Sequence, residues 1–153
     1  MITADQVKEL RSRTGLGVVQ CKNALLESSG DIEKAIELLK KQGAAIAAKK
    51  AGRDLGAGIV QAYIHGGGRV GAMVELLCET DFVAKNDEFR ALAYELAMQI
   101  SATDDTVIEV GVEEVLKQPY IKNPALSVGD LITSAVQKFG ERTEICRIAK
   151  FKV

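Results

Sequence analysis

The spacing of apolar residues divides the 153-residue chain into a helical beginning and a longer part of mixed helices and strands. Three short helices are predicted within residues 1–43, because polar residues able to cap a helix precede the apolar positions. Thr3 and Gln6 form a capping box for the first helix, and Asp31 caps the third. We expect Gly43 to end the third helix and to close a three-helix module.

Residues 44–58 differ in character from the helices before them. Alanines and the pair Lys49-Lys50 favour a short basic helix. The glycines that follow at positions 52, 56 and 58 then loosen the chain. The sequence therefore predicts a basic helical linker over residues 44–58 and a domain boundary there.

Residues 59–153 show the mixed pattern of an α+β core. Two β-type segments, 59–65 and 69–78, surround three consecutive glycines, which tolerate the positive φ of a tight turn. Asn86 starts a long amphipathic helix, residues 128–139 form another, and the alternating last ten residues form a strand. The predicted fold class is α+β, with a small antiparallel sheet of about three strands packed by helices.

The composition and charge of the chain exclude several classes of protein. The net charge of −1 argues against a nucleic-acid binder, and no apolar run is long enough to span a membrane. The charge is nevertheless segregated, because residues 1–53 and 117–153 are basic whereas residues 54–116 are strongly acidic. Three widely spaced cysteines exclude a disulfide scaffold, and no signal peptide is recognisable, so we expect a cytoplasmic location.

Enzyme motifs are incomplete wherever they are suggested. The chain has no phosphate-binding loop, and its single histidine, His65, precedes three glycines in a pattern found in esterases. Ser127 imitates a nucleophile but is better explained as a helix N-cap with Asp130. We therefore expect no enzyme, no catalytic residue, no metal site and no cofactor.

The residues that follow the second β-type segment are not fully explained by a role in folding. Asp81 and Phe82 lie between polar neighbours just after the strand that ends at Cys78. Two interpretations are open: Phe82 completes the hydrophobic core, or it projects as an aromatic wedge for a pocket on a partner.

Two long motifs give the chain a family resemblance. The first runs from Leu10 to Leu25 and the second, Glu-Leu-Leu-Cys-Glu-Thr-Asp-Phe-Val-Ala, from Glu75 to Ala84. With these motifs at the expected spacing, the chain resembles the elongation factor Ts family, the guanine-nucleotide exchange factors of elongation factor Tu. Shorter matches, such as the segment from Gln118 to Lys122, support the same resemblance.

The resemblance implies a function and a set of contact residues. It implies a UBA-like domain at residues 1–43 and a core at 59–153 that together bind elongation factor Tu. In the family, the Asp-Phe pair enters Tu near its Mg²⁺ site and promotes the release of GDP. The partner-binding residues implied here are Arg11, Val18, Val19, Thr80, Asp81, Phe82 and Val83.

The chain departs from the family pattern at several positions, and a second function is also considered. Val18 and Val19 stand where the family often has methionines, and the last strand lacks the paired arginines that are typical near the C-terminus. Short members of the family form homodimers through the core and last strand, so a homodimer is expected. The alternative function is a binding module that docks on a protein without promoting nucleotide exchange.

Overall fold

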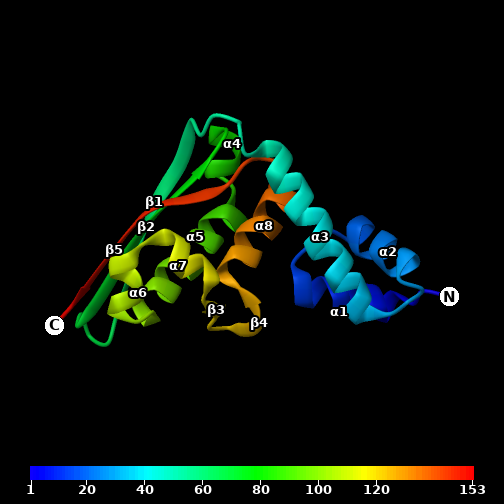
Figure 1. Cartoon of the computed structure of the whole chain (residues 1–153), viewed down its shortest axis with the longest axis horizontal. Helices are drawn as coiled ribbons and strands as arrows, with labels where there is room; N and C mark the ends of the chain where they lie inside the picture. The colour runs from blue at the N-terminus through cyan, green and yellow to red at the C-terminus, as the bar shows by residue number, and fades with distance from the viewer. The chain divides into compact units, whose positions relative to one another are not determined.

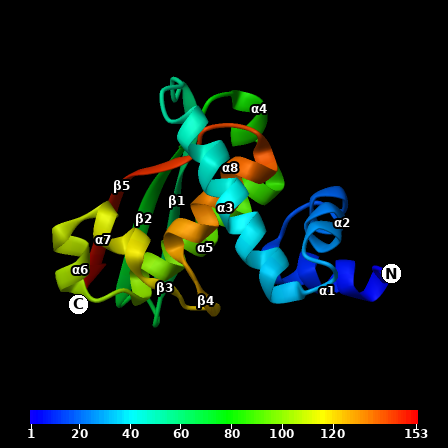
Figure 2. The same cartoon turned by 45° about the vertical axis from the view of Figure 1, so that its right-hand side comes forward.

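The computed structural model describes all residues from 1 to 153, and its chain forms two compact units. The helical unit comprises Met1–Gly52 and Thr133–Gly140, and the sheet unit comprises Arg53–Ile132 and Glu141–Val153. Figures 1 and 2 show the helices and strands of both units. The observed class, helices with a small antiparallel sheet of three strands, is the α+β class that the sequence predicts.

The helical unit begins with three helices, α1 (Ala4–Thr14), α2 (Val18–Glu27) and α3 (Ile32–Lys50). The predicted capping box is present, because the Thr3 side chain accepts from the Gln6 backbone N–H and Gln6 accepts from the Thr3 N–H. Apolar side chains from all three helices and the first turn form the core of this unit: Leu10, Leu16, Cys21, Ala24, Leu25, Ala35 and Leu39.

The third helix does not end at Gly43, so the prediction of a separate basic helix within residues 44–58 is wrong. α3 continues without interruption to Lys50, because a single glycine costs only about 1 kcal/mol against alanine in a helix. Gly43 is buried, and a Cβ there would lie 2.9 Å from Thr133 Cγ2 and from Gln137 Oε1. The glycine therefore permits a close approach of side chains from a later helix.

The three-stranded sheet has the order β1 (Ala57–His65), β2 (Val70–Cys78) and β5 (Glu144–Lys152). Both neighbours run antiparallel to β2, which therefore has hydrogen-bonded partners along both edges. The β1–β2 hairpin turns at three glycines that all have positive φ, as the sequence predicts. Figure 1 shows β2 between the other two strands.

Helix α5 (Asp87–Ala102) packs on one face of the sheet and contributes a large part of the core there. The Asn86 side chain accepts from the N–H groups of Glu88 and Phe89, so the predicted cap is confirmed. Most of the buried apolar residues of this layer come from α5 and from one face of β2: Phe89, Ala93, Leu96, Ala97, Ile100, Ala72, Val74, Leu76 and Cys78.

The other face of the sheet is open and apolar. Val60, Ile64, Met73 and Phe151 are exposed on it, and this set is called the open face below. Ile64 and Phe151 flank Gly71 across the three strands, because β2 pairs Gly71 with both of them. The open face is therefore one continuous surface of the sheet.

The segment between α5 and β5 contains small elements that the sequence analysis does not assign. Two short helices, α6 (Asp105–Val110) and α7 (Val112–Lys117), precede a hairpin of β3 (Pro119–Tyr120) and β4 (Asn123–Ser127). Helix α8 (Val128–Phe139) follows at its predicted bounds. None of the helices combines the length and the apolar character that crossing a bilayer requires.

Two adjacent leucines in α2 test the core of the helical unit. Leu25 is fully buried, whereas Leu26 is exposed. We expect Leu25→Ala to lower the free energy of unfolding by about 2–5 kcal/mol, because it leaves a cavity. Leu26→Ala is expected to change it by less than about 0.5 kcal/mol. Urea unfolding followed by circular dichroism measures both, and equal losses would contradict this placement of the core.

Candidate functional site in the turn after the central strand

The candidate site begins where β2 leaves the sheet. The last residue of the strand, Cys78, is buried, and its thiol lies 3.3 Å from the carbonyl oxygen of Thr80. The chain then forms the one-turn helix α4 (Asp81–Ala84), in which only Ala84 is buried. A buried residue on each side therefore fixes the ends of the short segment Thr80–Val83, called the exposed turn below.

Phe82 projects from the exposed turn into solvent. Its exposed fraction is 90%, whereas Val83 is half-buried and Asp81 is exposed. The interpretation of Phe82 as a core residue is therefore wrong. Burying a phenylalanine ring is worth about 1.5–3 kcal/mol, and this chain leaves that contribution unused. A large apolar side chain so placed is available for contact with another molecule.

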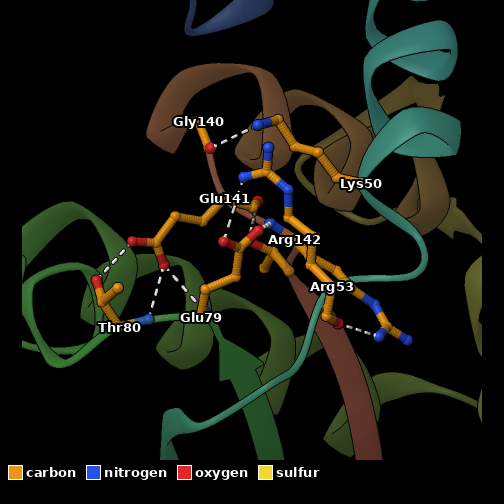
Figure 3. Close-up of polar contacts among 8 residues, drawn as sticks. Lys50, Arg53, Glu79, Thr80, Gly140, Glu141 and Arg142 are labelled. Carbon is orange, nitrogen blue, oxygen red and sulfur yellow. Dashed lines mark hydrogen bonds and ion pairs between the residues drawn. The ribbon is translucent and has the colours of Figure 1, made fainter.

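The base of the exposed turn is held by polar contacts from a distant part of the chain. The carboxylate of Glu141 accepts from the backbone N–H groups of Glu79 and Thr80, each at 2.9 Å, and from the Thr80 hydroxyl. Figure 3 shows Glu141 reaching across to Thr80. Sequence analysis misses Glu141, because it is 61 positions from Thr80 and belongs to no recognised motif.

Electrostatics make Cys78 an unreactive thiol. Burial, together with the negative charge of Glu141, raises the pKa of Cys78 to about 11. At neutral pH this cysteine is a protonated, buried side chain, as is expected of a structural rather than a catalytic cysteine.

The other predicted contact residues lie in the helical unit. Arg11 and Val18 line one groove, together with Lys8, Lys22 and apolar side chains of α1. Leu16, in the turn that joins α1 to α2, is buried, whereas Val18 and Val19 in the first turn of α2 are exposed. The structure thus groups Arg11 and Val18 in one groove, and Thr80 to Val83 in one turn.

The residues of the hydrolase alternative have structural partners. The Ser127 hydroxyl accepts from the Asp130 N–H at 3.0 Å and the Asp130 carboxylate accepts from the Ser127 N–H, which confirms the predicted N-cap. His65 Nδ1 lies 2.9 Å from the Tyr63 hydroxyl. No three or more His, Cys, Asp or Glu side chains are arranged to hold a metal ion.

Comparison with known proteins identifies the class and then the family. The relatives described below are elongation factors, and each of them is an elongation factor Ts. The chain belongs to the elongation factor Ts family. The family model, described as "Elongation factor TS", matches residues 79–153, which include the exposed turn and Glu141.

The curated relatives match the whole chain. The elongation factor Ts of Carboxydothermus hydrogenoformans is 44% identical over 194 aligned residues, covering 100% of this chain and 89% of the relative. That of Caldanaerobacter subterraneus subsp. tengcongensis is 42% identical, with 99% and 96% covered, and that of Heliobacterium modesticaldum is 41% identical, with 100% and 90% covered. The alignments are longer than the 153-residue chain, so these relatives carry residues without a counterpart here.

Phe82 in the exposed turn and Phe89 in the nearby helix α5 test the assignment of the turn as a surface. We expect Phe82→Ala to change the free energy of unfolding by less than about 0.5 kcal/mol, because the ring touches little of the chain. Phe89→Ala, which empties a fully buried position, is expected to cost about 3–5 kcal/mol. Urea unfolding of both variants gives the comparison. A large loss for Phe82→Ala would show that its ring packs in the core in solution.

Proposed function

We propose that the protein is the guanine-nucleotide exchange factor of elongation factor Tu. It binds Tu in the GDP-bound and nucleotide-free states and uses Asp81 and Phe82 to disturb the site that holds Mg²⁺ and the phosphates. The observation that supports this proposal best is the 90% exposed Phe82, in a motif that the chain shares with its family. The place of action that this function implies is the cytoplasm, where translation occurs.

Exchange follows from thermodynamic linkage. If the protein binds Tu more tightly without GDP than with GDP, then GDP binds more weakly by the same factor when the protein is present. Each tenfold loss of GDP affinity requires about 1.4 kcal/mol of differential contact. Burying Phe82 only in the nucleotide-free state supplies about 1.5–3 kcal/mol, which corresponds to one or two factors of ten.

Asp81 acts beside the metal in this proposal, and it is not a permanent ligand. Mg²⁺ requires near-ideal octahedral geometry at about 2.0–2.1 Å, so a small shift of the element that carries its ligands is enough to release it. Asp81 and Phe82 are adjacent in the exposed turn, so the turn presents a carboxylate and an aromatic ring together. The ring displaces the element of the partner that carries the Mg²⁺ ligands, and the charge of Asp81 disfavours phosphate nearby.

The helical unit provides the second contact in this proposal. Arg11, Val18 and Val19 combine a fixed positive charge with an exposed apolar pair. Lys8 and Lys22 line the groove of Arg11 as well, so this surface suits an acidic partner with an apolar stripe. Binding through this surface does not itself distinguish the nucleotide states, and that task falls to the exposed turn.

Removing the aromatic ring tests the exchange mechanism. We expect Phe82→Ala to reduce the stimulated release of a fluorescent GDP analogue from Tu by about 10–100-fold in stopped-flow measurements. Val110→Ala removes another exposed apolar side chain, from α6, and is expected to leave the rate unchanged.

The outcomes of that experiment separate the candidate functions. An unchanged rate for Phe82→Ala would contradict the wedge mechanism. If the unmodified protein binds Tu without accelerating GDP release, the chain is instead a binding module without exchange activity.

We also propose that two copies of the chain pair through the open face. This face places Val60, Ile64, Met73 and Phe151 in solvent on the side of the sheet away from α5. In a two-fold dimer the same surface of each copy contacts the other, so pairing through the open face would bury these apolar side chains in both copies. The cross-strand ion pair of Glu75 with Arg147 lies on the same face, which gives the pairing a polar element.

A charge placed on the open face tests the dimer. We expect light scattering to give the mass of two chains for the unmodified protein and of one chain for Phe151→Glu, because the pairing would bury an unpaired charge. Phe151→Leu keeps the position apolar and is expected to remain dimeric. A one-chain mass for the unmodified protein would contradict the proposed pairing.

A further inference from the structure

We propose that Glu141 is a positioning residue for the exposed turn, so that its carboxylate determines where Phe82 projects. The inference rests on the proposed role of Phe82 in nucleotide exchange. Glu141 directly follows α8 and Gly140, whereas the turn follows β2. The two segments meet only in the folded sheet unit, where Figure 3 shows their contacts.

A single carboxylate binds three donors at the base of the turn. One oxygen of Glu141 accepts from both the Glu79 and the Thr80 N–H at 2.9 Å, and the other accepts from the Thr80 hydroxyl at 2.5 Å. Two consecutive N–H groups held by one oxygen define the direction of the backbone as it leaves the strand. Bonds to a carboxylate are short and strong, so this constraint is stiffer than a neutral one.

The carboxylate of Glu79 binds the segment that contains Glu141 in turn. Glu79 accepts from the Arg142 N–H at 2.7 Å, so each segment supplies an acid to the backbone of the other. Arg53 lies 3.4 Å from the second oxygen of Glu79, and the Arg142 guanidinium donates to the Arg53 carbonyl. The side chain of Glu79 is only 16% exposed, so this arrangement is partly shielded from water.

The exposed side of the turn needs such a constraint, because the buried residues Cys78 and Ala84 fix only its two ends. Thr80 occupies the N-cap position of α4, yet its side chain makes no capping bond and donates to Glu141 instead. A four-residue helix is far too short to be stable by itself. Thr80, Asp81 and Phe82 are all exposed, so burial does not determine their direction. Glu141 therefore prepares the turn for binding before the partner arrives, which lowers the ordering cost of association.

The first experiment reads the turn directly and needs no partner. Glu141→Gln removes the negative charge, so the side-chain oxygen that remains binds the two backbone N–H groups without the charge assistance of a carboxylate. We expect amide hydrogen exchange at Glu79 and Thr80 to accelerate by about tenfold while the amides of β2 keep their protection. Glu109→Gln, the same change at an exposed acid of α6, is the control and is expected to alter neither.

The second experiment is a double-mutant cycle on stimulated GDP release from Tu. We expect Glu141→Gln to lower the maximal release rate by about tenfold, with less than a threefold change in the half-saturating concentration. In a Phe82→Ala background the same substitution is expected to have no further effect, because Glu141 acts through Phe82.

Each result supports or overturns the proposal. Equal losses in both backgrounds, unchanged protection at Glu79 and Thr80, or lost protection throughout β2 would each overturn it. If Glu141→Gln does not fold, Thr80→Val removes only the hydroxyl donor and is expected to accelerate amide exchange at position 80, whereas Thr80→Ser is not. If the unmodified protein fails to stimulate release, the exchange function fails, while the amide measurements still decide whether Glu141 positions the turn.

Discussion

The sheet unit depends on one constraint, the pairing of β2 along both of its edges. A strand that is paired on both edges cannot slip in register without exposing the residues that it buries. β2 buries Ala72, Val74, Leu76 and Cys78 against the side of the sheet that α5 covers. Because the strand cannot move, the point at which its chain leaves the sheet is also determined. The exposed turn begins at that point.

The exposed turn has a base held by hydrogen bonds and a tip whose apolar side chain, Phe82, is not buried. Cys78 and Ala84 are buried at its two ends, and the carboxylates of Glu79 and Glu141 hold the backbone between the segments. At the tip, Phe82 gains nothing from the chain that carries it. Local choices that contradict the rule of apolar burial are typical of functional positions, where a contribution to folding is given up for contact with a partner. The same reasoning applies to the open face, whose apolar side chains have no partner within the chain.

Much of the local structure could be predicted, because it depends on neighbouring residues. The caps at Thr3, Asn86 and Ser127 each need an acceptor and an N–H group two or three positions away. The role of Gly43, in contrast, cannot be predicted from its neighbours along the chain. A glycine is compatible with a helix end and with a close contact in the middle of a helix, and only its neighbours in space, Thr133 and Gln137, distinguish the two. For the candidate site, the motif gave the residues of the turn but left Phe82 either buried or exposed.

The sequence by itself determined the α+β class, the caps and the hairpin, and a motif specific enough to indicate the family. These features follow from hydrophobic periodicity and from contacts that are short along the chain. Only the tertiary structure decided that α3 continues through Gly43, that Phe82 faces solvent, and that Glu141 holds the base of its turn. The first and the last depend on residues tens of positions apart, which only the folded chain brings within van der Waals or hydrogen-bond distance. The exposure of Phe82 depends on which residues fill the core, and local sequence does not specify this.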